Sequence, residues 1–320
     1  MKIARVTTHG VRGLPDRTFD LTDPSNGQPL DVVFLTGAPG AGKTSFLDAI
    51  AAAKEDVAPY GPRRSPASMV RRGAAAAKIR IDWWLTDAER ARLAVDRPEL
   101  SSESILSPSV PPSTAHDPRL VTLLGAYDHR PETPKLEYFH EHRTLARGST
   151  GSSALAPADQ RAMRLGKDLF KYAVLPRYLV EVYLDALSGG TAAAEFEKGY
   201  ASLSRTRKPG GLRKTHAGRE VFFVADDGSE VGIEDLSASE QQAVIFAATV
   251  PFVGLAHSVL LVDAPELHLS SAAVVPFTFA LAELSVGNQL IVATGSAELV
   301  RKAAAHAVIT LGTPPGKLGS

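Results

Sequence analysis

Asp31-Val-Val-Phe-Leu-Thr-Gly37-Ala38-Pro39-Gly40-Ala41-Gly42-Lys43-Thr44-Ser45-Phe-Leu-Asp-Ala-Ile50 is the stretch around which we expect the chain to fold. Its apolar run from Val32 to Leu35 predicts a buried strand, and the glycine-rich residues 37–42 predict a tight turn. Lys43 to Ala53 predicts a helix. The sequence therefore predicts a strand, a loop and a helix in direct succession.

The spacing of the glycines, the lysine and the threonine in this stretch matches the phosphate-binding loop. Glycines let backbone N–H groups converge on phosphate oxygens, Lys43 adds a positive charge, and the Thr44 hydroxyl can ligate Mg²⁺. The N-terminus of the following helix adds its own partial positive charge. We therefore expect a nucleoside triphosphate to bind here, through Gly37, Ala38, Pro39, Gly40, Ala41, Gly42, Lys43, Thr44 and Ser45.

The composition narrows the class of protein. Lys plus Arg and Asp plus Glu both number 35 in 320 residues, so no global basic charge favours nucleic acid, and this balance does not argue against a local basic patch. There is no cysteine, which excludes disulfides, thiolate metal sites and cysteine nucleophiles. The start lacks the apolar core of a signal peptide, and the apolar stretch 243–262 contains Pro251 and precedes Asp263. We expect a soluble, cytoplasmic protein without membrane insertion, in which 243–262 forms a buried helix, a turn and a strand.

The first half of the chain predicts antiparallel strands and loops. Residues 1–8 and 17–21 predict a hairpin, and the alternation over 78–85 predicts a half-buried strand. A short helix is expected over 86–95, and a further strand over 135–140. Two stretches rich in Ser, Pro or Gly, residues 100–118 and 147–153, predict mobile loops.

The second half predicts helices and then parallel α/β structure. Apolar residues at helical spacing over 159–200 predict two or three helices, and Asp227-Gly228 predicts a hairpin turn. Residues 204–216 predict a loop that is either solvated or a contact for a phosphate or a partner, through Arg205, Arg207, Lys208, Arg213 and Lys214. Apolar runs that predict buried parallel strands alternate with helical stretches, in the order 259–262, 272–284, 290–293, 297–305 and 308–311.

Two further motifs accompany the phosphate loop. Val259-Leu-Leu-Val-Asp263 is an apolar run that ends in an acid, and an acid at the carboxyl end of a parallel strand faces the ligand crevice. Asp263 is therefore predicted to hold Mg²⁺ together with Thr44. Leu236-Ser237-Ala-Ser239-Glu-Gln-Gln begins a long apolar helix, and a serine cap followed by an acid could start any helix.

Together these residues resemble the ABC-type ATPases, in the branch shared by SMC-like, RecF-like and OLD-like proteins. The resemblance implies an α/β P-loop NTPase fold with an antiparallel β-subdomain and an inserted helical subdomain. Residues 1–320 would be one head, with its nucleotide-binding core at 1–60 and 219–311, the β-subdomain and flexible insertions at 77–140, the helical subdomain at 157–205 and a loose tail at 312–320. It further implies ATP and Mg²⁺ as cofactors. ATP would be clamped between two heads, with Ser237 and Ser239 of one head facing the loop of the other.

The chain also departs from that family. Ser239 replaces a glycine of the signature, Ala264 replaces the water-activating glutamate, and Gly295 stands where the family has its switch histidine. No equivalent of the family's glutamine loop is evident. General-base assistance contributes about 10²–10⁴-fold, so we expect slow hydrolysis, with Glu266 as the remaining catalytic candidate.

Two interpretations of function remain open. The first is a head that dimerises on ATP, as a homodimer or a heterodimer, and drives an effector protein, in DNA repair or anti-phage defence by resemblance. Turnover that rises with a partner or DNA would favour it. The second is a degenerate nucleotide-binding subunit with a structural or sensing role, beside a competent partner. ATP retained without turnover would favour that one.

Overall fold

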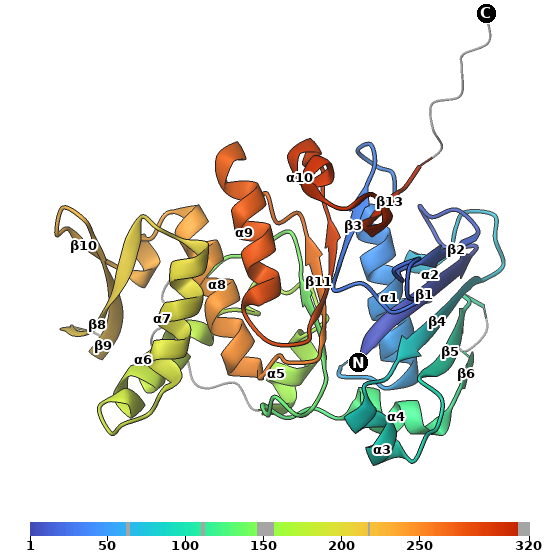
Figure 1. Ribbon diagram of the computed structural model, residues 1–320, viewed down its shortest axis with the longest axis horizontal. Coiled ribbons are helices and arrows are strands. Elements are labelled where there is room, and N and C mark those ends of the chain that lie inside the picture. Colours follow the sequence, from blue (N-terminus) through green and yellow to red (C-terminus); the bar gives the residue numbers. More distant parts are fainter. Residues whose placement is uncertain (62–64, 110–112, 146–156, 217, 313–320) are drawn as a thin grey trace, which may run out of the picture.

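A five-stranded parallel sheet lies at the centre of the molecule, which is a computed structural model (Figure 1). The structure describes residues 1–61, 65–109, 113–145, 157–216 and 218–312. The strand order is β13-β3-β12-β11-β7, and each pairing is parallel. The strands are β3 (Val32–Thr36), β7 (Leu136–Phe139), β11 (Val259–Asp263), β12 (Gln289–Ala293) and β13 (Val308–Thr310).

The two faces of this sheet belong to two hydrophobic cores. Successive side chains of a strand point to opposite faces, so Leu261 packs into the core that contains α1 (Lys43–Val57), and Val262 packs into the other. That second core contains α8 (Ala238–Val253) and α9 (Ser271–Glu283). All five residues of β11 are buried, which confirms the prediction of continuous apolar strands.

A five-stranded antiparallel sheet packs on the other side of α1 (Figure 1). Its order is β2-β1-β4-β5-β6, and the predicted hairpin of residues 1–8 and 17–21 is confirmed as β1 and β2. The buried indole of Trp83 donates a hydrogen bond to Ser102 Oγ at 2.9 Å. The strands are β1 (Lys2–His9), β2 (Arg17–Asp20), β4 (Ala77–Trp84), β5 (Glu99–Leu106) and β6 (Ser113–His116).

The prediction of a mobile loop over 100–118 is wrong. Residues 99–106 form β5, which pairs with β4 along its whole length, and 113–116 form β6. Two serines of β5 share its buried face with Leu100 and Leu106, so the face is not recognisable as apolar from the sequence. Ser102 and Ser104 are buried, and Ser102 accepts the Trp83 hydrogen bond, so these side chains are satisfied inside the sheet. The expected loop over 147–153 lies outside the described residues.

Strand β7 belongs to the parallel sheet, although its residues fall in the range 77–140 that we expected to form the antiparallel subdomain. Phe139 pairs with Val262 of β11, so both strands run in the same direction and end at the same edge. The residues after β7 therefore reach the same end of the sheet as Asp263. This placement brings into the site a segment that the sequence did not predict there.

Two of the inserted helices and a small antiparallel sheet form one end of the molecule (Figure 1). The predicted helices of 159–200 are confirmed as α5 (Pro157–Met163), α6 (Leu175–Ala186) and α7 (Ala192–Leu203). The loop predicted over 204–216 is instead mostly strand β8 (Arg207–Thr215), which pairs with β9 (Gly218–Ala225) and absorbs its Pro-Gly-Gly run in a bulge. The hairpin at Asp227-Gly228 joins β9 to β10 (Glu230–Gly232), as predicted.

The remaining elements are short or cover the edges of the sheets. Within the described ranges, no helix is both long and apolar enough to cross a membrane. The apolar stretch 243–262 is divided between α8 and β11, as predicted. Residues 313–320 of the expected tail lie outside the described part. The other helices and 3₁₀ turns are α2 (Pro66–Met69), α3 (Asp87–Leu93), α4 (Pro118–Gly125), α10 (Ala297–Lys302), η2 (Ile233–Asp235) and η3 (Ala305–Ala307).

Candidate functional site

The predicted phosphate loop connects β3 to α1. Gly37 and Gly42 have φ angles of 146° and 94°, which L side chains rarely adopt. A β-carbon on Gly42 would overlap the carbonyl oxygen of Gly13, and one on Gly37 would overlap that of Leu311. The loop is therefore held between the β1–β2 connection and the residue after β13, and both glycines are required by close backbone approach.

Lys43 folds back over this loop. Its ammonium donates hydrogen bonds to the carbonyl oxygens of Gly37 at 2.8 Å and Ala38 at 3.2 Å. Ala38, Pro39 and Gly40 are exposed at the tip of the loop. The positive charge thus lies beside the backbone at the start of the loop. Ala41 packs at the edge of the core, and the Ser45 hydroxyl faces Gly13.

Thr44 and Asp263 meet at the carboxyl end of the parallel sheet. Burial raises the pKa of Asp263 to about 6, and a hydrogen bond from the Thr44 side chain opposes that rise. The Tyr138 hydroxyl donates to Asp263 Oδ2 at 3.4 Å. The two residues predicted to hold Mg²⁺ are therefore in contact, with oxygen atoms of the kind that this ion prefers.

Glu141 is a site residue that the sequence did not predict. It follows β7, and its negative charge further raises the pKa of Asp263. Lys167 lies between two acids, 3.7 Å from Glu141 and 3.4 Å from Asp48 of α1. The signal that could have found Glu141 is the same as for Asp263. Leu136-Glu-Tyr-Phe139 is a strand with an acid two residues after its end, but Glu137 interrupts the apolar run that would mark it as a buried parallel strand.

Glu266 is tied to the segment that follows β12. Its Oε1 accepts from the Gly295 N–H at 2.7 Å, and its Oε2 accepts from the Thr294 hydroxyl at 2.9 Å. The carboxylate therefore spans the turn after β11 and the turn after β12, and it has a donor on each oxygen. Ala264 lies in the turn after β11 with a φ angle of 47°, in the left-handed region.

Ser237 caps α8, as the sequence pattern predicts. Ser237 Oγ accepts from the Glu240 N–H, and Glu240 accepts from the Ser237 N–H at 2.9 Å, so a complete capping box starts the helix. Ser239 Oγ lies 3.2 Å from Ser237 Oγ. Ser237 is exposed, whereas Glu240 is buried and also accepts from Arg207 at 2.7 Å. Helix α8 packs in the core opposite to α1, so the two motifs lie on different sides of the central sheet.

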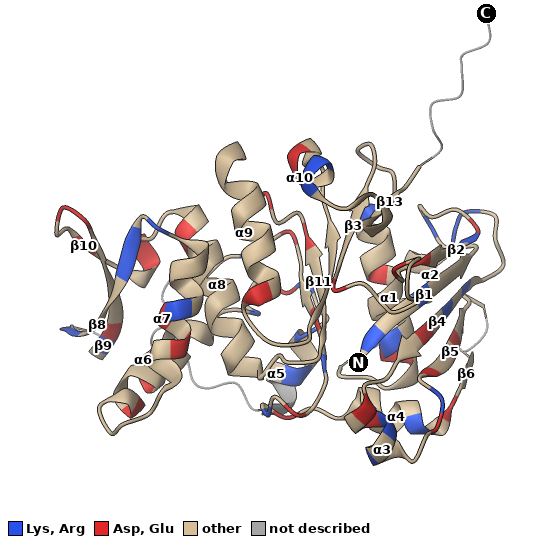
Figure 2. Cartoon of the chain, in the orientation of Figure 1, with Lys and Arg blue, Asp and Glu red and all other residues tan. Residues whose placement is uncertain are grey.

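The five basic residues predicted as a partner contact have different environments. Arg207 pairs with Glu240 at 2.7 Å, and Arg213 pairs with Glu220 at 2.8 Å. Arg205, Lys208 and Lys214 are exposed. Figure 2 shows Lys and Arg positions, in blue, along the small antiparallel sheet at the end of the molecule, away from the phosphate loop. Two of the five basic residues are therefore already in ion pairs within the chain.

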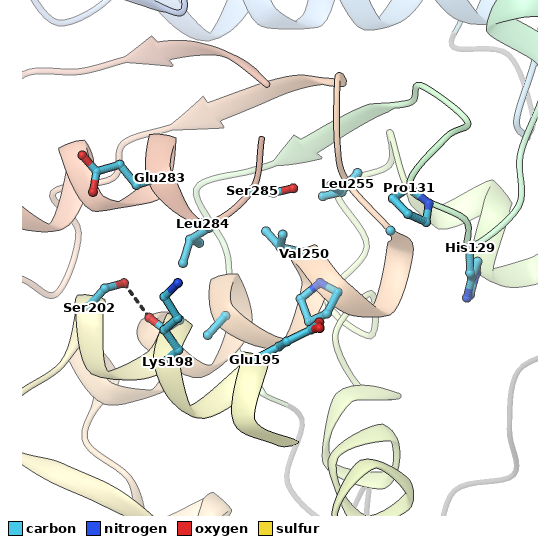
Figure 3. A pocket seen from close by; sticks show the side chains of 14 residues that line it. His129, Pro131, Glu195, Lys198, Ser202, Val250, Leu255, Glu283, Leu284 and Ser285 are labelled. Atoms are coloured by element: carbon cyan, nitrogen blue, oxygen red, sulfur yellow. Dashed lines mark hydrogen bonds between the residues drawn. The ribbon is translucent and has the colours of Figure 1, made fainter. Parts of the chain in front are cut away.

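The structure has a groove beside the phosphate loop and a separate cavity away from it. A groove of about 540 Å³ borders the phosphate loop at Gly40 and contains Arg17 and Arg71. A cavity of about 430 Å³ lies between α7, α8 and the residues after α9, where Lys198, Val250 and Leu284 line it (Figure 3). None of the predicted site residues lines this second cavity. The groove beside the loop is therefore the one that continues the candidate site.

Comparison with known proteins identifies the fold. No protein-family model and no curated protein matches the chain. An SMC head bound to the C-terminal winged-helix domain of ScpA matches with a TM-score of 0.60 and 15% identity, over 98% of this chain and 95% of that one. An SMC head from Pyrococcus furiosus, with an extended coiled coil and the C-terminal domain of ScpA bound, gives 0.58 and 14%, over 96% and 92%. The SMC head domain from Thermotoga maritima gives 0.50 and 12%, over 95% and 92%.

The chain has the fold of SMC head domains, which confirms the predicted fold class. The identities lie between 12% and 15%, so the likeness concerns the fold and not the individual motifs.

Proposed function

We propose that the chain is an ATP-binding head that requires Mg²⁺ and dimerises on the nucleotide. The observation that carries the proposal is the convergence of the Lys43 ammonium, the loop backbone and the Thr44–Asp263 pair at one end of the parallel sheet. Oxygen ligands beside a backbone cradle fit a nucleotide with its divalent ion. The SMC-like fold supports the same conclusion, because ABC-type heads bind nucleotide in this loop.

The roles of the residues follow from their positions. Backbone N–H groups of 37–45 would donate to the phosphates, and Lys43 would exchange its two carbonyl contacts for phosphate oxygens. Thr44 and Asp263 would hold Mg²⁺, which supplies positive charge against the β- and γ-phosphates. Because burial raises the pKa of Asp263, the metal ion would also stabilise its ionised form.

Dimerisation is proposed from the position of the signature. Ser237 and Ser239 lie at the start of α8, on the opposite side of the sheet from α1 and its loop. A second head, identical or different, would bring its exposed helix N-terminus to the nucleotide. An effector protein would then respond to the dimer, and exposed Arg205, Lys208 and Lys214 are candidates for contact with it or with nucleic acid.

One observation favours a second candidate, a degenerate subunit that binds ATP and does not hydrolyse it usefully. Both oxygens of Glu266 accept hydrogen bonds from Thr294 and Gly295, so the remaining catalytic candidate is engaged within the chain. Ala264 can neither accept nor relay a proton. A competent partner head would then supply the missing chemistry.

The first experiment measures ATP turnover and bound nucleotide on the same sample, for the wild type and for Lys43→Ala. We expect Lys43→Ala to abolish nucleotide binding, and Lys302→Ala, an exposed lysine on α10, to leave it unchanged. If Lys43→Ala binds the nucleotide as well as the wild type does, the proposed site is refuted. Turnover near 1 s⁻¹ or above, about the low end for working enzymes, would exclude the degenerate subunit.

A gain-of-function variant tests the second candidate directly. Ala264→Glu restores an acid in a partly exposed turn, and a non-glycine residue already adopts the left-handed backbone there. If only the general base is missing, turnover should rise by about 10²–10⁴-fold. Ala264→Gln has a similar size and no basic carboxylate, so it should remain slow. An equal rate for both variants would mean that more than this one group is absent.

Analytical ultracentrifugation with ATP and Mg²⁺ tests the dimer. We expect a nucleotide-dependent dimer that Ser237→Arg abolishes, because the new side chain would occupy the exposed helix start. Ser188→Arg, at the exposed turn between α6 and α7, is the matched control and should still dimerise. A monomer under all conditions would favour a heterodimer with another head.

A further inference from the structure

Arg143 is a buried arginine whose hydrogen-bond partners are carbonyl and amide oxygens. Its side chain is 2% exposed, and among the described residues no ion pair with an acid is formed. Nη1 donates to the carbonyl oxygens of His140 at 2.8 Å and Asp263 at 2.6 Å, and Nη2 donates to that of Ala264 at 2.9 Å. A buried cation is costly unless each donor finds a partner. Its position therefore depends on the exact placement of several backbone segments.

One of those partners lies on the signature helix. Arg143 Nε donates to Gln242 Oε1 at 2.6 Å, and Gln242 Nε2 donates back to the Arg143 carbonyl oxygen at 2.9 Å. Gln242 is itself buried, within the first two turns of the helix that Ser237 caps. The reciprocal pair fixes the rotation of α8 relative to the segment after β7.

The other partners form the turn that follows β11. Arg143 donates to the carbonyl oxygens of both Asp263 and Ala264, which belong to the peptide groups before and after the left-handed residue Ala264. The same turn is held from its other side by the hydrogen bond from Ala264 N–H to the Ala293 carbonyl oxygen at 2.8 Å. A planar guanidinium can satisfy both carbonyl groups at once, which an ammonium cannot do in the same geometry.

We propose that Arg143 is a positioning residue that couples the signature helix α8 to the turn carrying the metal-binding Asp263. A second head that engages the start of α8 would shift Gln242, and the shift would reach Asp263 through one side chain. The metal site would thereby respond to dimerisation. The effect on the metal and the nucleotide rests on the proposed function. The coupling between α8 and the turn after β11 does not depend on it.

Hydrogen exchange of the ligand-free chain tests the coupling without nucleotide. Gln242→Ala removes the reciprocal pair and keeps the carbonyl contacts of Arg143. Gln241→Ala is the matched control, because Gln241 lies on the same helix and donates to Leu236 instead. We expect amide protection over 263–266 to fall by about tenfold in Gln242→Ala, as for the loss of one charge-assisted hydrogen bond. Protection over 263–266 should stay within about twofold in Gln241→Ala. Equal protection in both variants would overturn the proposal.

ATP affinity with Mg²⁺ and with EDTA tests the consequence at the metal site. Arg143→Lys and Gln242→Ala should reduce the advantage given by Mg²⁺ by about tenfold, while binding in EDTA, which uses the loop and Lys43, changes little. Gln242→Glu keeps an acceptor for Arg143 Nε and should recover most of that advantage. If the ATP affinity falls equally with Mg²⁺ and with EDTA, Arg143 has only a structural role and the proposal is overturned. A wild type that binds no ATP would refute the proposed function, and the exchange comparison would still decide the coupling.

Discussion

Single residues of the phosphate loop are constrained by backbone contacts that the sequence pattern does not contain. The pattern specifies glycine at positions 37 and 42, and the structure gives the reason, which is the approach of the Leu311 and Gly13 carbonyl groups. Gly13 lies in the β1–β2 connection, far from the loop in the sequence. The glycines that the motif requires for binding a ligand are therefore also required for folding.

Gly42→Ala tests that double constraint. A left-handed backbone costs an L residue roughly 1–2 kcal/mol, and overlap with the Gly13 carbonyl group should add about 1–3 kcal/mol. Gly27→Ala is the matched control, since Gly27 has a φ angle of 70° and open space around its would-be β-carbon. Urea unfolding should show a larger loss for Gly42→Ala, together with loss of ATP binding. Equal losses would mean that the backbone conformation alone demands glycine.

At the scale of elements, the sequence predicted the parallel core well and the polar strands poorly. The strands β3, β11 and β12 each contain a continuous run of four apolar residues because both of their faces are covered, and this signal is local. The sequence predicts a loop at β5 because its segment is rich in serine and proline, and a loop at β8 because basic residues surround Pro209-Gly210-Gly211. Their stability comes from pairing with β4 and β9, which local composition cannot reveal.

The same distinction applies to the candidate site. Lys43, Thr44 and Asp263 follow from spacing, and the structure brings Thr44 and Asp263 into contact. Glu141 and Arg143 depend on β7 lying beside β11, a pairing between segments more than a hundred residues apart. The hydrogen bonds of Glu266 depend likewise on the turn after β12. Such contacts require the sheet order, which the motifs do not encode.

Helix α1 carries a buried lysine that makes stability depend on pH. Burial lowers the pKa of Lys54 to about 7, although Glu55 at 3.1 Å opposes the shift. The unfolded chain binds a proton at Lys54 up to about pH 10, whereas the folded chain loses it above about 7. Between these values the unfolded state holds more protons, so the free energy of unfolding should rise with pH by at most about 1.4 kcal/mol per unit.

Lys54→Met isolates this contribution. The variant keeps the hydrogen bonds from the Tyr60 and Gly61 N–H groups to Glu55, and it has no titratable group at position 54. Urea unfolding of both proteins at pH 7 to 9.5 should show the wild type gaining stability relative to the variant. Lys135 and Lys171, whose pKa values burial lowers to about 8, contribute equally to both proteins and cancel. Parallel pH profiles would show that Lys54 is not desolvated.

At the scale of the whole molecule, the helical insertion is attached to the central sheet by buried charges. Lys171, which precedes α6, lies 2.6 Å from Glu137 of β7, and Arg164 lies 3.8 Å from the same carboxylate. All three side chains are at most 2% exposed. Breaking a buried pair by removing one partner costs about 3–5 kcal/mol, because the other charge stays buried. The attachment of the helical insertion to β7 therefore depends on Lys171 and Glu137 being present together.

A double-mutant cycle over Glu137→Leu and Lys171→Met measures that dependence. Each single variant should lose about 3–5 kcal/mol of unfolding free energy, while the double variant should lose clearly less than their sum. Arg177→Ala, which breaks the exposed pair with Glu181 within α6, should change stability by less than about 1 kcal/mol. Additive losses in the cycle would show that the two charges act separately, with Lys171 stabilised by backbone carbonyl groups such as that of Arg164. Strong coupling in the cycle would mean that the insertion is attached to the edge strand β7 by the Glu137–Lys171 pair as a unit.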